Sequence, residues 1–332
     1  MSKLRIGVVG AGGIASAHLP HLSQRSDAVE LVGVADVRPE AAAATAQKYG
    51  MAQHVTDYQE LLPEVDAVLV CVPTFLHAEV AVAALNAGKA VFCEKPLART
   101  MEQANAMLEA ANMSGAALQV GFVRRFDDEW LSWRDAVLAE KIGRPLVWRD
   151  IMAGAGPASP WFNTDEQGGG PFLDGCIHNI DFALYTFGPV EWVFTHARTF
   201  RDSNTAIDTG TSTVRFQSGD EMLLAWSWGL PKDCGGGRIF EFLGPRGTLR
   251  WPQDEEAGAT ERKFVINQGT DKESVSFPSN ALGIGFERQM DEFIAVAQGQ
   301  QKPRADGEAG RAALQVALAI LQSGRTQQIV RL

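Results

Sequence analysis

The first third of the chain alternates short apolar runs with stretches of helical periodicity. The runs are rich in Val and Leu and polar only at their edges, which is typical of strands buried on both faces of a parallel sheet. We expect such strands at residues 4–9, 29–35, 67–72, 90–93 and 118–122. Helical spacing follows four of them, at residues 14–24, 41–49, 78–87 and 101–114. Because strand-then-helix units cross over with the right hand, this part predicts an α/β Rossmann fold with a doubly wound parallel sheet.

The pattern changes after residue 126. A helix (129–140), a strand (145–152), a loop rich in Gly and Pro (153–171) and a further helix (172–187) are expected in turn. Strand-like runs separated by turns come next, at residues 190–198, 211–217, 222–229, 239–243, 248–251 and 264–267. Two helices close the chain, at 286–297 and 308–323, the second with Gly324 as its C-cap. Neighbouring strands joined by turns favour an α+β domain with a large, mostly antiparallel open sheet.

Composition and charge narrow the class of partner. A chain of 332 residues has room for two domains, and the 45% hydrophobic and 21% charged residues are ordinary for a globular protein. A net charge of −10, without a run of five like charges, argues against nucleic acids and anionic membranes as partners. There is no CxxC spacing, no secretory signal and no run of about 18 apolar residues. We therefore expect a cytoplasmic protein with reduced cysteines.

A glycine-rich turn joins the first strand to the first helix. Residues 10–15 read G-A-G-G-I-A, the G-x-G-x-x-G/A dinucleotide fingerprint, so Gly10, Gly12, Gly13 and Ile14 are expected at the cofactor phosphates. The second strand ends in Asp36, about 20 residues on, where a carboxylate would hold the ribose 2′-hydroxyl. Asp36 favours NAD, while Arg38 could accept a 2′-phosphate and leaves NADP open.

A second turn at the same edge of the sheet follows the strand at residues 67–72. It carries Val72, Pro73, Thr74 and His77, which we expect to border the cofactor because open α/β sheets bind ligands at the carboxyl ends of their strands. Two interpretations of His77 remain open: a helix-start residue packed on the sheet, or a neighbour of the nicotinamide ribose. The domain division that follows is residues 1–123 for NAD(P) binding and 124–332 for substrate binding and oligomerisation.

The segment Phe92-Cys93-Glu94-Lys95-Pro96-Leu97 resembles the Glu-Lys-Pro signature of the Gfo/Idh/MocA oxidoreductases, the glucose–fructose oxidoreductase and inositol dehydrogenase group. The similarity covers nearly the whole chain, through the fingerprint and the segments 73–77, 121–126 and 168–178. The resemblance implies that Glu94 and Lys95 border the cofactor and that the Lys95–Pro96 bond is cis.

Oxidation of a secondary alcohol needs a base for the hydroxyl proton and a cationic donor for the developing alkoxide. Asp174, His178 and Asp181 are spaced by four and three residues, which puts them on one face of the expected helix at 172–187. A polar stripe facing solvent is the other interpretation, but the helix is otherwise apolar. The resemblance implies that His178 is the general acid/base, that Asp174 binds and orients substrate, and that Lys95 completes the catalytic set.

The resemblance implies that Arg124 faces substrate or cofactor and that Arg125 forms structural ion pairs. Trp161 and Asn163 of the long loop are expected to contact substrate, the alternative for the tryptophan being a hydrophobic anchor. The resemblance also suggests an aromatic near the nicotinamide at Phe286. Cys176 lies two residues before His178, faces away from it on a helix and has no second Cys/His cluster nearby, so no metal site is predicted.

These features predict an NAD-dependent dehydrogenase that oxidises a secondary hydroxyl of a sugar, glycoside or cyclic polyol, or reduces the matching ketone. Inositol itself is in doubt because residues 151–156 are small and apolar, whereas inositol-specific relatives tend to be polar there. Two alternatives remain: a redox-neutral glycosidase that uses bound NAD transiently, and a non-catalytic dinucleotide-binding sensor. A free apolar sheet face would be costly in a monomer, so we expect a homodimer or homotetramer.

Overall fold

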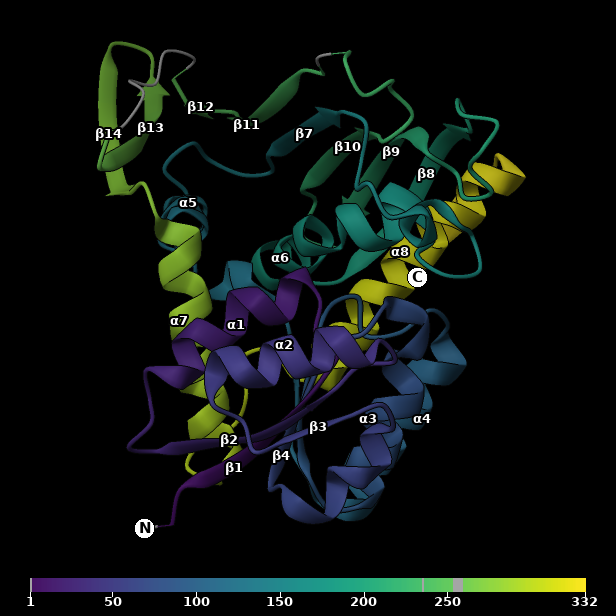
Figure 1. Ribbon diagram of the computed structural model, residues 1–332. Coiled ribbons are helices and arrows are strands. Elements are labelled where there is room, and N and C mark those ends of the chain that lie inside the picture. Colours follow the sequence, from purple (N-terminus) through teal and green to yellow (C-terminus); the bar gives the residue numbers. More distant parts are fainter. Residues whose placement is uncertain (1, 235, 253–258) are drawn as a thin grey trace. The chain divides into compact units, whose positions relative to one another are not determined.

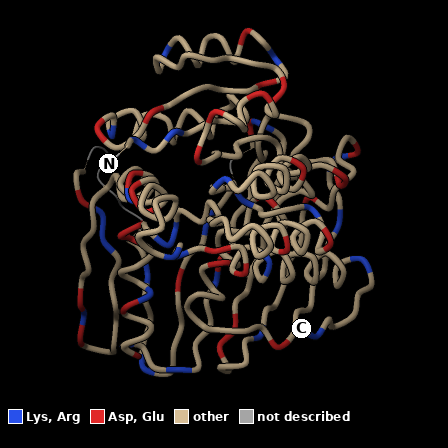
Figure 2. Tube along the Cα trace, turned by 90° about the horizontal axis from the view of Figure 1, so that it is seen from below, with Lys and Arg blue, Asp and Glu red and all other residues tan. Residues whose placement is uncertain are grey.

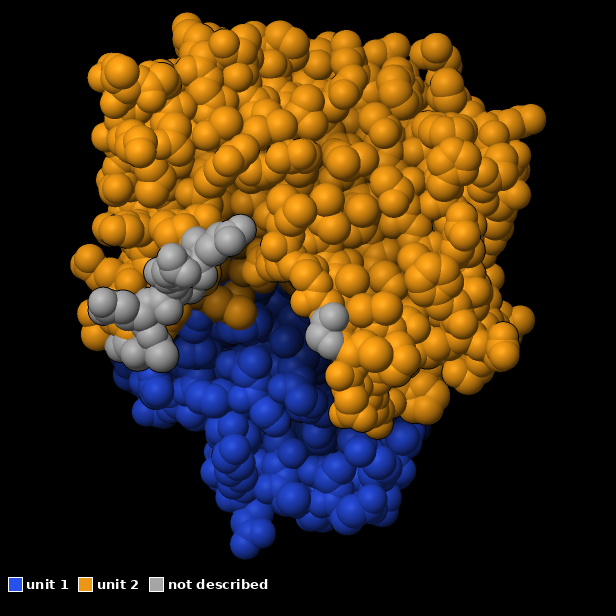
Figure 3. Space-filling model, turned by 90° about the horizontal axis from the view of Figure 1, so that it is seen from above, with its two compact units in different colours: residues 1–123, 283–311 blue, residues 124–282, 312–332 orange. Residues whose placement is uncertain are grey.

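The computed structural model describes residues 2–234, 236–252 and 259–332, and these form two compact units. Unit 1 comprises residues 1–123 and 283–311, and unit 2 comprises residues 124–282 and 312–332 (Figure 3). The expected domain boundary after residue 123 coincides with the first crossing between the units. Residues 283–311, which the sequence analysis assigned to the second domain, belong to unit 1.

Unit 1 is built on a six-stranded parallel sheet (Figure 1). Its strand order is β3-β2-β1-β4-β5-β6, which reverses between β1 and β4 as in a doubly wound fold. The strands are β1 (Leu4–Val9), β2 (Val29–Ala35), β3 (Gln53–Val55), β4 (Ala67–Val70), β5 (Ala90–Cys93) and β6 (Leu118–Val120). The Rossmann architecture predicted from the sequence is therefore confirmed.

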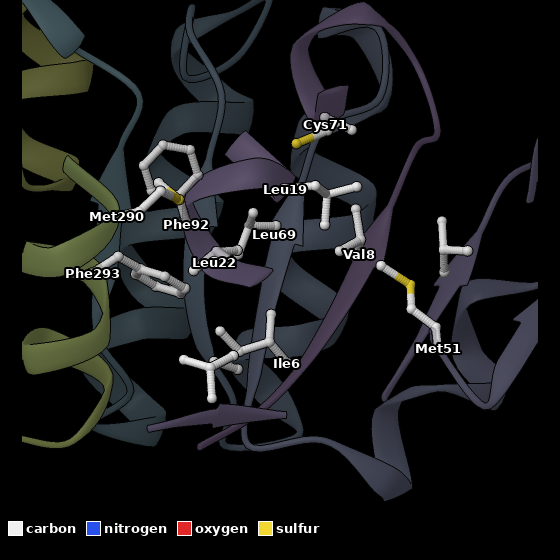
Figure 4. Close-up of a cluster of buried hydrophobic side chains, with 14 of the residues drawn as sticks. Ile6, Val8, Leu19, Leu22, Met51, Leu69, Cys71, Phe92, Met290 and Phe293 are labelled. Carbon is white, nitrogen blue, oxygen red and sulfur yellow. The ribbon is translucent and has the colours of Figure 1, made fainter. Parts of the chain in front are cut away.

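Helices cover both faces of this sheet. The helices are α1 (Gly13–Ser23), α2 (Pro39–Tyr49), α3 (His77–Asn86), α4 (Met101–Ser114) and α7 (Ala281–Ala297). Alternate strand residues such as Ile6, Val8 and Leu69 share one apolar cluster with Leu19 of α1 and Phe293 of α7 (Figure 4). Helix α7 joins unit 1 because its apolar face completes this cluster, an arrangement between distant parts of the chain that local periodicity does not reveal.

Unit 2 is built on a nine-stranded sheet of order β14-β13-β12-β11-β7-β10-β9-β8-β15. All its pairs are antiparallel except β7 with β10, so the expected mostly antiparallel sheet is confirmed. The strands are β7 (Val147–Ala153), β8 (Val190–Arg198), β9 (Thr209–Phe216), β10 (Glu221–Ser227), β11 (Arg238–Gly244), β12 (Gly247–Arg250), β13 (Glu261–Gln268), β14 (Asp271–Pro278) and β15 (Val330–Arg331).

Helices α5 (Asp128–Leu138), α6 (Ile177–Phe187) and most of α8 (Gly307–Thr326) belong to unit 2. Aromatic side chains join helix to sheet: Trp133 of α5 packs against Trp148 of β7 at 5.3 Å and Phe242 of β11 at 4.6 Å between ring centroids. The opposite sheet face carries ion pairs such as Arg250–Glu241 and the exposed apolar residue Ile239. One face of the sheet is thus a closed core, while the other is mixed in polarity.

Two details of unit 2 correct the sequence analysis. The expected helix at 172–187 is divided into a π-helical turn, Pro171–Gly175, and α6, which begins at Ile177. Gly324 does not end α8, which continues to Thr326. A Cβ on Gly324 would meet the Cβ of Ala197 at 2.8 Å, so a residue without a side chain permits close packing of α8 on β8.

Charged residues of both signs are interspersed along the chain (Figure 2). Within the described ranges no helix combines the length and the apolar character that a membrane crossing requires.

Candidate functional site

The fingerprint turn connects β1 to α1 in unit 1. Gly10 has φ of +99°, and a Cβ there would lie 2.5 Å from the carbonyl oxygen of Cys71, so only glycine fits. Gly12 is the N-cap of α1, and a Cβ on Gly12 or Gly13 would meet no atom within 4 Å. The first turn has no side-chain cap and no acidic residue. Open space in front of uncapped helix N–H groups fits the pyrophosphate of a dinucleotide.

Asp36 closes this turn from the end of β2. Its carboxylate accepts a hydrogen bond from the Ala11 N–H (2.8 Å to Oδ2) and from the Arg38 N–H (2.9 Å to Oδ1). The Arg38 guanidinium adds Nε and Nη2 contacts of 3.0 and 3.1 Å. Burial raises the pKa of Asp36, but the hydrogen bonds from Arg38 and Ala11 outweigh it and hold the pKa below its usual value. The carboxylate is therefore ionised at neutral pH and lies beside the fingerprint, as expected of a ribose ligand.

His77 joins two turns at the carboxyl edge of the sheet. Its buried ring places Nδ1 2.8 Å from the carbonyl oxygen of Pro96 and Nε2 2.9 Å from that of Val72. Burial lowers the pKa of His77, partly opposed by these two hydrogen bonds. Thr74 is buried in the same turn, and Pro73 precedes it in extended backbone. The buried ring at the start of α3 fits the interpretation of His77 as a packed helix-start residue, and a position beside the nicotinamide ribose stays a prediction.

Glu94 is also turned into unit 1. Its carboxylate lies 2.7 Å from Nε2 of His18 and accepts the Lys95 N–H at 3.0 Å. Burial raises the pKa of Glu94, but the contacts with His18 and Lys95 outweigh it and lower the pKa. The Lys95–Pro96 bond is cis, as the resemblance implied. Lys95 itself is partly exposed at the end of β5.

In unit 2 the expected polar face does not form as a single helical stripe. Asp174 lies in the π-helical turn and is buried, whereas His178 lies in the first turn of α6 and is partly exposed. Asp181 is fully buried and accepts two hydrogen bonds from Arg125, at 2.6 and 3.0 Å. His178 and Asp181 share α6, but the charge of Asp181 is paired with Arg125, so Asp181 has a structural partner of its own.

The neighbouring arginines take different partners. Arg125 pairs with Asp181 and lies over the ring of Tyr185 at 4.6 Å, which is the structural role expected for it. Arg124 bonds Asp127 at 3.2 Å and lies over Trp130.

The long loop holds its aromatic residues as a pair. Trp161 stacks on Phe162 with 3.7 Å between ring centroids, and Phe162 meets the edge of Trp228. Asn163 is buried, and its carbonyl oxygen accepts the Ala206 N–H at 3.1 Å. The backbone of this loop is therefore tied to the neighbouring loop of unit 2.

No cluster of His, Cys, Asp or Glu among the described residues could hold a metal ion. Cys176 is buried, with its thiol 3.4 Å from the Phe172 carbonyl oxygen. The site residues thus divide between the units: the fingerprint, Asp36 and Lys95 in unit 1, and Arg124, Trp161, Asp174 and His178 in unit 2.

Two family models match the chain: an oxidoreductase family with an NAD-binding Rossmann fold over residues 4–122, and the GFO/IDH/MocA C-terminal domain over residues 130–250. D-glucoside 3-dehydrogenase of Escherichia coli is 31% identical over 355 residues, covering 100% of this chain and 98% of that relative. This chain belongs to the Gfo/Idh/MocA family. It is an oxidoreductase whose first unit is an NAD-binding Rossmann domain.

Other relatives in the family match less of their length. Myo-inositol 2-dehydrogenase of Thermotoga maritima is 37% identical over 223 residues, which are 65% of this chain and 66% of that protein. Among solved structures, the WlbA dehydrogenase of Bordetella pertussis in complex with NADH and UDP-GlcNAcA superposes with a TM-score of 0.82 at 25% identity, over 100% of this chain and 99% of that one.

Sequence reasoning missed several polar residues of this Gfo/Idh/MocA chain that lie beside the expected ones. Asn179 of α6 donates to the buried carboxylate of Asp150 on β7. Burial raises the pKa of Asp150 to about 6, partly opposed by Asn179 and Arg238. His18 was also missed, because its partner, Glu94, lies 76 residues away in the sequence. A polar residue inside an otherwise apolar run, as at Asp150, is the one signal that could have indicated such a pair.

Proposed function

We propose that the chain is an NAD-dependent dehydrogenase that oxidises a secondary hydroxyl of a sugar, a glycoside or a cyclic polyol, or reduces the matching ketone. One observation carries the proposal: the chain aligns from end to end with a relative named D-glucoside 3-dehydrogenase. The relative named myo-inositol 2-dehydrogenase also belongs to the polyol class. A glycoside is preferred over inositol because residues 151–156, Ile-Met-Ala-Gly-Ala-Gly, offer few groups to a ring of hydroxyls.

The residues of unit 1 fit NAD. The uncapped start of α1 would bind the pyrophosphate, and the ionised carboxylate of Asp36 would accept from the ribose 2′-hydroxyl and repel a 2′-phosphate. When bound, oxidised NAD supplies the acceptor for the hydride that leaves the alcohol carbon. NAD is therefore proposed over NADP.

The chain's own residues handle the proton. His178, partly exposed in the first turn of α6, would take the hydroxyl proton during oxidation and return it during reduction. Asp174, four residues earlier, would orient the substrate through its hydroxyls. Lys95 would donate to the substrate oxygen and stabilise its developing negative charge. The direction used in the cell depends on the supply of substrate and cofactor.

The proposal is tested by following NADH formation from NAD with a panel of methyl glycosides, free aldoses and inositols. Lys95→Ala and His178→Asn should each lower kcat by at least about 100-fold, the scale of one acid–base or electrostatic group. Lys89→Ala is the matched control, because Lys89 precedes the opposite end of the same strand, β5. Cleavage of a glycoside without net NADH would replace the proposal with a redox-neutral glycosidase. Tight NAD binding with no turnover on any substrate would favour a sensor.

A further inference from the structure

The backbone that carries Lys95 is held by a buried pair of polar side chains. Glu94 is 4% exposed, and both of its carboxylate oxygens are used, one by the ring of His18 and one by the Lys95 N–H. Gly121, which directly follows β6, packs against the carboxylate, since a Cβ there would lie 2.9 Å from Cδ of Glu94. The carboxylate is therefore fixed by atoms from three segments of unit 1.

His18 has no exposed surface and lies on α1, one turn beyond the fingerprint. The imidazole ring makes edge-to-face contacts with two aromatic rings, Phe92 at 5.0 Å and Phe286 at 5.3 Å between centroids. Its Nδ1 is buried without a hydrogen-bond partner in the described part of the chain, so the Glu94 contact is the ring's polar anchor. Placing a polar ring here costs desolvation that only the bond to Glu94 offsets.

A second histidine holds the residue on the other side of Lys95. Nδ1 of His77 lies 2.8 Å from the Pro96 carbonyl oxygen, and Nε2 lies 2.9 Å from that of Val72. The backbone on either side of Lys95 is thus anchored by buried groups from α1 and from the start of α3.

We propose that His18 and Glu94 are positioning residues that fix the direction in which the Lys95 amine is presented. This inference rests on the proposed role of Lys95 in the reaction. This role requires no contact of either side chain with substrate or cofactor: Glu94 orients the Lys95 backbone directly, and His18 orients Glu94. The same connection joins α1, whose first turn would bind the pyrophosphate, to the turn that carries the lysine.

The test compares His18→Asn with Glu94→Gln. The first variant removes the ring that fixes the carboxylate, whereas the glutamine keeps the size of Glu94 and an acceptor for the Lys95 N–H. His21→Asn is the matched control, because His21 lies on the same helix and does not bond Glu94. If His18→Asn does not fold, Gly121→Ala displaces the same carboxylate from its other side.

The readout that needs no substrate is the rate at which the Lys95 amine reacts with trinitrobenzenesulfonate, followed by peptide mass spectrometry. We expect that rate to change at least about threefold in His18→Asn and not in His21→Asn. In turnover assays we expect kcat to fall about tenfold or more, as for a misaligned catalytic group, with the Kd for NAD within about threefold of wild type. Glu94→Gln should retain more activity than His18→Asn.

A double variant separates positioning from general damage. In a Lys95→Ala background, His18→Asn should cause almost no further loss of kcat, because there is no amine left to position. An equal loss in both backgrounds, or an unchanged Lys95 reaction rate in His18→Asn, would overturn the inference. Full turnover by Lys95→Ala would instead remove the proposed function, and the amine reactivity would still report on whether His18 and Glu94 position Lys95.

Discussion

Replacing Asp36 with serine should move the cofactor preference of the chain from NAD toward NADP. The Asp36 side chain is only 8% exposed and holds the guanidinium of Arg38, whose side chain is 58% exposed. The substitution removes the carboxylate that would accept from a ribose 2′-hydroxyl. It also releases a cation at the position where a 2′-phosphate would lie.

The magnitude follows from these contacts. Loss of a hydrogen bond to a charged acceptor weakens binding by about 1.5–3 kcal/mol, so NAD should bind roughly 10- to 150-fold more weakly. The gain for NADP is smaller, because a pair between the exposed Arg38 and a phosphate contributes only about 0–1 kcal/mol. Together the ratio of the two dissociation constants should shift by about 1.5–4 kcal/mol, or roughly 10- to 1000-fold.

Fluorescence titration with NADH and NADPH measures both dissociation constants. Asp36→Asn is the matched control, since it keeps an acceptor for the Ala11 N–H and removes only the charge. Adding Arg38→Ala to Asp36→Ser should cancel the gain for NADP. Unchanged NADH binding in Asp36→Ser would refute the ribose contact, and unchanged NADPH binding would refute the role of Arg38.

Three further predictions concern stability and assembly. Asp150→Asn should raise the free energy of unfolding at pH 7–8 by up to about 3 kcal/mol. The folded-state pKa of Asp150, about 6, stabilises the fold below about pH 4, and this contribution is lost as the pH rises through 6. Urea titrations in which the stability advantage of the variant does not grow between pH 4 and 7 would contradict this prediction. Gly10→Ala should lower the free energy of unfolding by about 2–4 kcal/mol, because of the positive φ and the contact with Cys71. Gly12→Ala should lower it by less than about 1 kcal/mol and weaken NAD binding instead. Equal losses of stability in urea would count against the backbone geometry described at Gly10. Sedimentation velocity should show a homodimer or homotetramer that Ile239→Glu weakens, since Ile239 is 45% exposed on the free sheet face; a wild-type monomer at working concentration rules this out.

The Rossmann sheet could be predicted closely because its strands are buried on both faces. Strands β1, β2 and β5 have the bounds expected from apolar runs alone. In unit 2 the pattern was weaker: β14 (Asp271–Pro278) is mostly polar and exposed, so neither periodicity nor hydrophobicity marks it. The break between the π-helical turn and α6 was also hidden: the turn ends at Gly175, where a Cβ would lie 2.6 Å from the indole of Trp228, a long-range contact that local periodicity does not reveal.

The site residues could be named from motifs, but their surroundings could not. Spacing along a helix placed Asp181 beside His178, yet its charge is satisfied by Arg125, 56 residues away in the sequence. His77 and Glu94 were expected at the cofactor, and the pattern gave no sign of the hydrogen bonds that they make to His18 and to the Pro96 carbonyl oxygen. A motif records which residue types a site needs, whereas long-range hydrogen bonds decide which of them face the ligand.

Three buried polar residues of unit 1 lie around the turns at the carboxyl edge of its sheet. His18, His77 and Glu94 all bond to the turns that follow β4 and β5, while the cluster between the sheet and α1 is apolar. A buried polar group without a partner costs about 1–3 kcal/mol, so an all-apolar interior would be the safer way to stabilise this sheet. Directional bonds offer what apolar contacts do not, a fixed orientation for the backbone on both sides of Lys95. Their position at the carboxyl edge therefore fits the role proposed for Lys95 better than a role in stability alone.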